Sequence, residues 1–134
     1  MVSSCLVKSA VRKRDVLIVD DELGVREVFA EILQDNGYAV DLAATAAEAR
    51  HLLSECHYQM VVADWRLPDG DGMAIANLAA AAGSYAFVMS GYLPRMLPGS
   101  VDPRQTLMKP VRPSELLAVA RAAIGKAPGA TIIR

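Results

Sequence analysis

Five short apolar stretches recur along the chain, and each of them stops at polar residues. They span residues 15–19, 38–43, 60–63, 85–89 and 105–108. The first is continuously apolar rather than alternating, which is typical of a strand covered on both faces of a parallel sheet. The stretch at 38–43 is more polar, so we expect its strand at an edge of the sheet.

Between these stretches the apolar residues follow a helical period. Thr45 is a suitable N-cap for a second helix, and the alanine-rich segment 72–82 predicts a third helix that ends at Gly83. Pro113 suits the first position of a last helix, which Gly125 closes. One face of the first helix is apolar at positions three and four apart: Val25, Val28, Phe29, Ile32 and Leu33.

Strand and helix therefore alternate, which predicts an α/β fold with a doubly wound five-stranded parallel sheet and helices on both faces. We expect the flavodoxin-like strand order 2-1-3-4-5. The domain is placed at residues 15–125, between a flexible N-terminal extension (1–14) and a C-terminal tail (126–134). Prolines in the segment 92–102 disfavour a regular fourth helix, so that helix is expected to be short or irregular.

Composition changes this picture little. The 134 residues fit one domain, and the apolar fraction of 53% is that of an ordinary globular protein. With 14 basic and 15 acidic residues, there is no electrostatic case for direct nucleic-acid binding. The basic residues near the start are expected to form a solvated arm. They are Lys8, Arg12, Lys13 and Arg14.

Cysteine usage and hydropathy bear on the compartment. Cys5 and Cys56 have neither metal-ligand spacing nor a disulfide framework around them, which indicates free thiols in a reducing environment. No apolar run approaches the roughly 18 residues of a membrane span, and no segment resembles a signal peptide. We therefore expect a cytoplasmic protein without a membrane partner.

Functional groups follow four of the five predicted strands. They are Asp20 and Asp21, Asp64, Ser90, and Lys109. Parallel strands have their carboxyl ends at one edge, so the three acids should converge there, and carboxylates without His or Cys are ligands that suit Mg²⁺. Lys109 and Ser90 add donors for an anion. This combination indicates phosphoryl transfer onto a carboxylate, which gives an acyl phosphate.

Each residue alone also has a structural explanation. Asp21 and Glu22 could favour the N-terminal end of a helix dipole. Ser90 could be a turn residue, and Lys109 a surface cation whose stem packs on the sheet. Only the joint occurrence at successive strand ends favours the phosphoryl-transfer site.

The ordered set of motifs resembles the receiver domain of two-component response regulators. The resemblance covers about residues 15–125. Its motifs are Asp20-Asp21, Asp64 followed by Leu67-Pro68-Asp69-Gly70 and Asp71-Gly72, Ser90-Gly91, and Lys109-Pro110.

The resemblance implies a role for each residue. Asp64 would accept a phosphoryl group from a sensor histidine kinase or a histidine phosphotransfer protein and would also contact Mg²⁺. Asp21 would bind Mg²⁺ directly, Asp20 would hold a metal-bound water, and the backbone carbonyl of Arg66 would complete the protein ligands. The protein would act as a switch and not as an enzyme, apart from self-catalysed phosphorylation and dephosphorylation.

The same resemblance assigns the anion side of the site. Ser90 would bond a phosphoryl oxygen and move toward it, and Lys109 would pair with Asp64 before transfer and with the phosphate afterwards. Pro110 is expected to follow a cis peptide bond, and Gly91 would keep the path to Asp64 open. The downstream output partner is not identified, and a homodimer is possible.

Several positions depart from the family pattern. Thr106 stands where receivers usually carry an aromatic ring that moves with the serine, and Val111 stands where Phe is common. Together with the proline-rich segment 92–102, these departures predict that signalling uses a different surface. Arg66 and Tyr92 are large residues at positions that tune hydrolysis, so slow loss of phosphate is expected.

Three functions are therefore compared. The first is a stand-alone phosphoacceptor switch. The second is a pseudo-receiver that binds partners without being phosphorylated, but such proteins usually lose the acceptor or an acid, and all are present here. The third is a Mg²⁺-dependent phosphatase, which usually has a second catalytic Asp at the position occupied here by Arg66.

Overall fold

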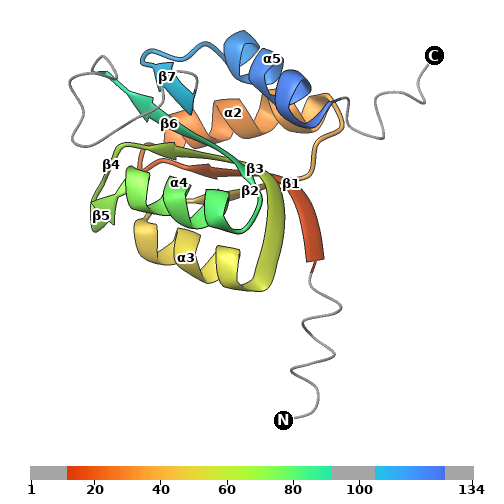
Figure 1. The fold of residues 1–134 in the computed structure, drawn as a ribbon. Helices are drawn as coiled ribbons and strands as arrows, with labels where there is room; N and C mark the ends of the chain where they lie inside the picture. The colour runs from red at the N-terminus through yellow and green to blue at the C-terminus, as the bar shows by residue number, and fades with distance from the viewer. Residues whose placement is uncertain (1–11, 92–104, 126–134) are drawn as a thin grey trace.

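The structure is a computed structural model that describes residues 12–91 and 105–125 (Figure 1). The elements in chain order are β1 (Arg12–Val19), α2 (Leu23–Asp35), β2 (Val40–Ala43), α3 (Ala46–Glu55), β3 (Cys56–Asp64), β4 (Arg66–Leu67), β5 (Gly70–Asp71), α4 (Gly72–Ala81), β6 (Tyr85–Ser90), β7 (Thr106–Met108) and α5 (Pro113–Ile124). The predicted extension up to residue 11, the segment 92–104 with the predicted irregular fourth helix and Tyr92, and the tail 126–134 lie outside the described residues.

Five of the described strands form one parallel sheet in the order β2-β1-β3-β6-β7. Because β6 and β7 are the fourth and fifth strands of this sheet, the predicted order 2-1-3-4-5 is confirmed. The more polar strand, β2, lies at an edge, as expected. Two short strands, β4 and β5, form a separate antiparallel pair directly after β3.

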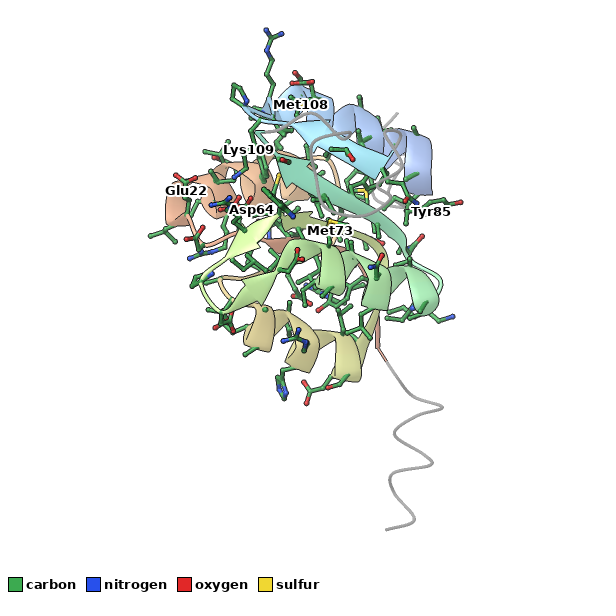
Figure 2. All side chains as sticks on the ribbon, turned by 60° about the vertical axis from the view of Figure 1, so that its left-hand side comes forward. Glu22, Asp64, Met73, Tyr85, Met108 and Lys109 are labelled. Carbon is green, nitrogen blue, oxygen red and sulfur yellow. The ribbon has the colours of Figure 1, made fainter. Side chains whose placement is uncertain are left out.

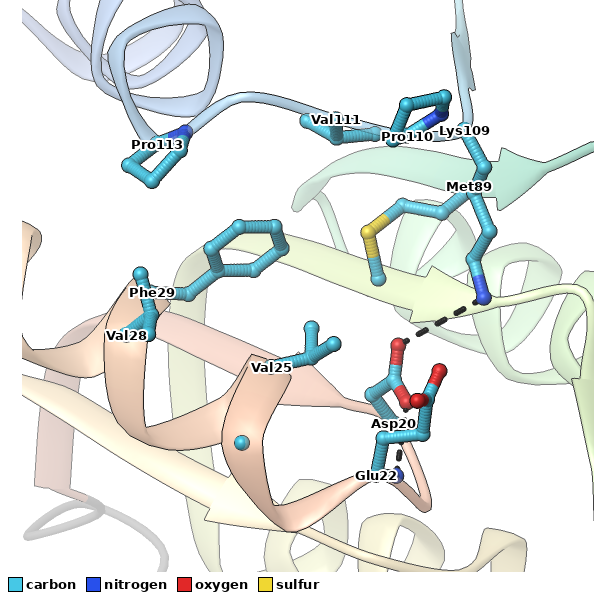
Figure 3. A pocket seen from close by; sticks show the side chains of 11 residues that line it. Asp20, Glu22, Val25, Val28, Phe29, Met89, Lys109, Pro110, Val111 and Pro113 are labelled. Carbon is cyan, nitrogen blue, oxygen red and sulfur yellow. Dashed lines mark hydrogen bonds and ion pairs between the residues drawn. The ribbon is translucent and has the colours of Figure 1, made fainter.

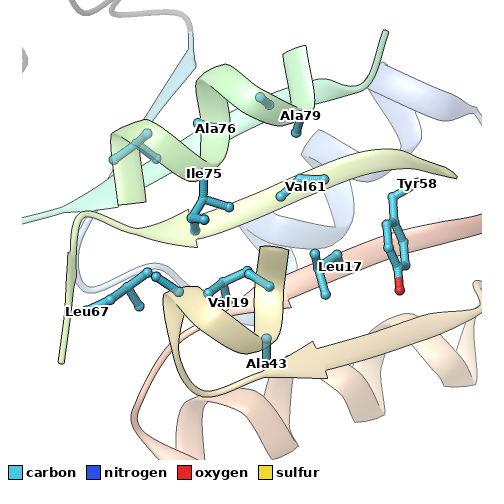
Figure 4. Packing of buried hydrophobic residues seen from close by; sticks show 14 of the residues in the cluster. Leu17, Val19, Ala43, Tyr58, Val61, Leu67, Ile75, Ala76 and Ala79 are labelled. Atoms are coloured by element: carbon cyan, nitrogen blue, oxygen red, sulfur yellow. The ribbon is translucent and has the colours of Figure 1, made fainter. Parts of the chain in front are cut away.

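Helices cover both faces of the sheet, with α2 and α5 on one side and α3 and α4 on the other (Figure 1). The continuous apolarity of β1 follows from this arrangement. Leu17 and Val19 point toward α3 and α4, while Val16 and Ile18 join the core beneath α2 and α5. Figure 4 shows the first of these cores, where Ile75 of α4 packs over β3 and β1.

Helix α2 confirms its predicted face only in part. Phe29 and Leu33 are buried, as the periodicity predicts. Val28 belongs to the same pattern but is 47% exposed. The reason is that α2 rests on the sheet along a narrow stripe, so a residue at the margin of its apolar face reaches solvent or a groove instead of the core.

The amino end of the sheet corrects the predicted boundary. Strand β1 begins at Arg12, not at residue 15, and Arg14 is level with Tyr58 of β3. The guanidinium of Arg14 lies 2.9 Å from Oδ1 of Asp41 on β2. Residues 12–14 therefore pair with β3 and do not form a flexible extension, and Arg14 in addition has a side-chain partner on β2.

None of the helices in the described ranges is long and apolar enough to cross a membrane.

Candidate functional site

The carboxyl ends of four parallel strands place the predicted site residues at one edge of the sheet. Figure 2 shows Asp64 and Lys109 at this edge. Asp20 follows β1, Asp64 ends β3, Ser90 ends β6 and Lys109 follows β7. Asp64 is level with Met89 on the neighbouring strand, so Ser90 lies one residue beyond the end of β3. The fold thus brings together the groups that the sequence had placed only at strand ends.

Lys109 lies directly against the acids. Its Nζ is 3.0 Å from Oδ2 of Asp64 and 3.9 Å from Oδ2 of Asp20. Its main-chain N–H donates to the carbonyl of Ser90 at 2.8 Å, and the Lys109–Pro110 peptide bond is cis, as expected. Burial alone would lower the pKa of Lys109, but the hydrogen bond and charge of Asp64 outweigh it and raise the pKa. Lys109 is therefore a fixed cation at this edge.

Asp20 is the most deeply buried acid of the site, with a side chain that is 0% exposed. Its Oδ1 accepts a hydrogen bond from the main-chain N–H of Glu22 at 2.9 Å. Its Oδ2 accepts none from any described residue. Burial, and next the charge of Asp64, raise the pKa of Asp20 despite the bond from Glu22. A buried carboxylate oxygen without a hydrogen-bond donor needs a positive charge nearby.

Three carboxylates share this edge. One oxygen each from Asp20, Asp21 and Asp64 lies within 4.8 Å of the others. Asp21 is exposed, whereas Asp20 and Asp64 are buried, so the cluster opens to solvent on one side. Like charges this close repel each other unless a cation neutralises them. The all-oxygen donor set and the orphaned Oδ2 of Asp20 both fit a hard divalent cation such as Mg²⁺.

The turn after Asp64 is held tightly by main-chain bonds. The N–H of Trp65 donates to the carbonyl of Met89, and the N–H of Gly72 donates to the carbonyl of Trp65, both at 2.8 Å. A Cβ at Gly72 would lie 1.8 Å from the carbonyl oxygen of Asp64. Gly72 is thus required for close approach, and the approach places the first turn of α4 directly behind the candidate acceptor.

Arg66 belongs to the same turn. Its guanidinium lies over the ring of Trp65, with its central carbon 5.1 Å from the ring centroid. Trp65 is half-buried. The role of the Arg66 backbone carbonyl as a metal ligand stays a prediction.

Asp69 has a structural role that the sequence did not reveal. Its carboxylate accepts hydrogen bonds from the main-chain N–H groups of Ala46 at 2.7 Å and Ala47 at 3.0 Å, at the start of α3. These two bonds lower the pKa of Asp69. The hairpin that follows the candidate acceptor is therefore tied to the neighbouring helix. Spacing could not reveal the bond, because its partners are more than 20 residues apart in the sequence.

A mainly apolar cavity of about 470 Å³ opens beside the acids (Figure 3). Asp20 and Lys109 lie at one end, and the walls come from α2, β6 and the segment before α5. Val28, exposed against expectation, is one of the lining residues, and Val111 is another. The sequence did not indicate this cavity, because its walls come from three distant segments.

Thr106, one of the positions that depart from the family pattern, lies among the described residues. Thr106 begins β7 level with Val88, and its side chain is half-buried. The structure brings Thr106 to the strand beside β6, as the resemblance implies for this position. That signalling uses a different surface because of departures such as Thr106 stays a prediction.

Comparison with known proteins agrees with this geometry. A family model described as the response regulator receiver domain matches residues 16–93. The transcriptional regulatory protein PmrA of Pectobacterium parmentieri is 43% identical over 62 residues, which cover 46% of this chain and 28% of that protein. The transcriptional regulatory protein AruR of Pseudomonas aeruginosa is 27% identical over 115 residues, which cover 79% of this chain and 47% of that protein. The chain thus spans about half the length of these relatives or less.

Solved structures show the same fold. The chemotaxis response regulator CheY4 of Vibrio cholerae is 22% identical, with a TM-score of 0.67 over 85% of this chain and 99% of that one. A CheY-like receiver domain protein from Methanospirillum hungatei is 26% identical, with a TM-score of 0.67 over 84% of this chain and 92% of that one. Motifs, strand order and family match agree: the chain belongs to the family of response regulator receiver domains.

Proposed function

We propose that this receiver domain is phosphorylated on Asp64 by a sensor histidine kinase or a histidine phosphotransfer protein. The observation that carries the proposal is the 3.0 Å contact between Lys109 Nζ and Asp64 Oδ2, in a cluster of three carboxylates. A buried acid that is held by a cation and flanked by two more acids serves no obvious purpose in packing. Such an acid suits a nucleophile that accepts a phosphoryl group, because the neighbouring cation can offset the added negative charge.

The transfer needs little chemistry from the protein beyond placement. A carboxylate oxygen of Asp64 forms a bond to phosphorus while the phosphorus–nitrogen bond of the donor phosphohistidine breaks, and the electron pair leaves with the imidazole nitrogen. Lys109 holds the carboxylate before transfer and pairs with the new phosphoryl oxygens afterwards. Ser90 would donate a hydrogen bond to one of these oxygens from the neighbouring strand.

The acids would hold Mg²⁺ through Asp20, Asp21 and Asp64, with the backbone carbonyl of Arg66 as a further ligand. When bound, the ion would neutralise negative charge that builds up around the transferred group. The donor set supports this assignment, since it contains oxygens alone.

The output of the switch is expected to be a change in binding to a downstream protein or to a second copy of the chain. Thr106 cannot fill the volume of an aromatic ring. A shift of Ser90 toward the phosphate would therefore not be accompanied by the ring movement that is usual in the family. The slow loss of phosphate expected from the large residues Arg66 and Tyr92 belongs to the same proposal.

The experiment is incubation of the protein with acetyl phosphate and Mg²⁺, followed by intact mass measurement. We expect a gain of one phosphoryl group that is absent without Mg²⁺ and absent in Asp64→Asn. Asp71→Asn is the matched control, because Asp71 is an acid of the same loop that accepts the N–H of Met73 at the start of α4, a bond that Asn can keep.

No gain in mass, or a gain that Asp64→Asn retains, would contradict the proposal. The first result would favour the alternative, a pseudo-receiver that binds partners without phosphorylation.

A further inference from the structure

The guanidinium of Arg26 makes an unusual contact at the edge of the site. From α2, its Nη1 donates to the main-chain carbonyl of Asp20 at 2.6 Å. The side chain of Arg26 is half-buried, and its own N–H bonds to the carbonyl of Glu22 at 3.1 Å. Hydrogen bonds from a charged donor are stronger than those between neutral groups. Arg26 therefore clamps the turn that carries the two adjacent acids.

The carbonyl of Asp20 needs such a donor because it lies beyond the strand ladder. Pairing between β1 and β3 ends at Val19 and Ala63 in the described register. The N–H of Asp20 still reaches the carbonyl of Ala43 on β2 at 3.0 Å. Its carbonyl has passed the last residue pair with β3, and a buried carbonyl without a partner would be costly. Arg26 supplies the missing donor.

With Arg26 in place, Asp20 is held on three sides. Its N–H is held by β2, its Oδ1 by the N–H of Glu22, and its carbonyl by Arg26. The atom that remains is Oδ2, which accepts no hydrogen bond from the described residues and lies 3.9 Å from Nζ of Lys109. The three bonds leave the residue little freedom to rotate, so Oδ2 stays directed at the side of the site where Lys109 lies.

We propose that Arg26 is a positioning residue for the cation site, and that its clamp on the Asp20 carbonyl keeps the carboxylates of Asp20 and Asp21 in place for Mg²⁺. The inference rests on the proposed function, since it assumes that the cluster binds Mg²⁺. Arg26 acts on the main chain of a ligand-bearing turn, so it differs from the residues assigned to the site so far.

The inference can be tested by the direction in which Mg²⁺ affinity changes when the charged side chain of Arg26 is removed. Arg26 is a cation beside a cation site, so its removal should tighten Mg²⁺ binding if its charge is what matters. If Arg26 only stabilises the fold, Mg²⁺ affinity should not change among folded variants. If Arg26 positions Asp20, its removal should weaken Mg²⁺ binding in spite of the electrostatic gain.

The experiment is calorimetric titration of MgCl₂ into the wild-type protein, Arg26→Met and Arg26→Gln, with unfolding measured in EDTA. Methionine keeps most of the side-chain volume, while glutamine keeps a neutral donor on a shorter stem. We expect the Kd for Mg²⁺ to rise about tenfold in both variants, at the lower end of the range for outer-shell partners of metal ligands.

Arg121→Met is the matched control. Arg121 is also a helical arginine whose guanidinium bonds an oxygen on another segment, Oδ1 of Asn36 at 3.0 Å, but on α5 at the far end of α2 from the acids. It should lose some stability and keep the wild-type Kd for Mg²⁺. A loss of affinity in Arg121→Met equal to that in Arg26→Met would overturn the inference.

The failures can be told apart. If the wild-type protein binds no Mg²⁺, the proposed metal site and this inference both fall. If the wild type binds Mg²⁺ and either folded Arg26 variant binds it equally or more tightly, only the inference falls. The glutamine variant keeps the test decisive should Arg26→Met not fold.

Discussion

Two polar clusters in the same sheet have opposite characters. Nearer the amino ends of β1 and β3, Asp41 is bonded by Arg14 at 2.9 and 3.2 Å and by the hydroxyl of Tyr58 at 2.6 Å. At the carboxyl edge, three carboxylates face the single ammonium of Lys109, and Oδ2 of Asp20 accepts no hydrogen bond from the described residues.

The difference shows how a structural ion pair is distinguished from a functional site. The Asp41 cluster has balanced charge, and both carboxylate oxygens have partners, so nothing further is required for stability. The Asp20 cluster has an excess of negative charge and an unsatisfied buried oxygen. Burying such a group costs free energy in the metal-free protein, and that cost identifies the edge where a ligand would stabilise the fold.

The largest expected effect tests how closely α4 approaches the carboxyl edge. Gly72→Ala places a Cβ 1.8 Å from the Asp64 carbonyl oxygen, so we expect a loss of about 3 kcal/mol in the free energy of unfolding or failure to fold. Gly24→Ala is the control, because a Cβ there meets no atom within 4 Å. Its free energy of unfolding should stay the same or rise by up to about 1 kcal/mol. Urea denaturation of both variants measures the effect, and equal stabilities would refute it.

The comparison itself predicts opposite signs for one chemical change in the two clusters. Asp41→Asn removes the partner charge of Arg14, and since both side chains are partly exposed, the free energy of unfolding should fall by about 1–2 kcal/mol. Asp20→Asn removes a buried, poorly satisfied charge and should raise stability by about 1 kcal/mol in EDTA.

Measurements with Mg²⁺ sharpen that test. Added Mg²⁺ should stabilise the wild type and Asp41→Asn by the same increment, since ligand binding to the folded state raises stability. The increment should vanish in Asp20→Asn. A loss of stability in Asp20→Asn that matches the loss in Asp41→Asn would show that the two clusters do not differ.

The smallest expected effect concerns the hydrogen bonds between Asp69, in the β4–β5 hairpin, and the start of α3. The bonds from Ala46 and Ala47 lower the pKa of Asp69 below its ordinary value of 3.8. An acid with a lowered pKa in the folded state stabilises the fold above the unfolded value and loses that contribution as the pH falls through the folded value. The stability difference between the wild type and Asp69→Asn should therefore be constant above about pH 5 and shrink below pH 4. Thermal unfolding of both proteins across this pH range measures the difference. A stability difference that does not change with pH would contradict the predicted role of the Asp69 hydrogen bonds.

The sequence predicted most of the fold because its signals are local. Continuous apolar runs such as the one ending at Val19 indicate covered strands, and the spacing of Phe29 and Leu33 indicates a helix face. The start of β1 was missed because Arg12, Lys13 and Arg14 are charged, and only the pairing with β3 and the partner on β2 place them in the sheet. Val28 was placed on the apolar face but is exposed, because periodicity shows which residues share a helix face but not how much of that face contacts the sheet.

By itself, the sequence determined the alternation of strands and helices and which residues end each strand, including Asp20, Asp64, Ser90 and Lys109. These depend on composition and spacing, and parallel pairing turns strand ends into one edge. Only the tertiary structure decided how each group is held: Lys109 against Asp64, Asp69 on α3, Gly72 behind Asp64, and Arg26 on the Asp20 carbonyl. Such contacts join residues through space, and a hydrogen bond depends on distances of a few tenths of an ångström that no residue pattern encodes.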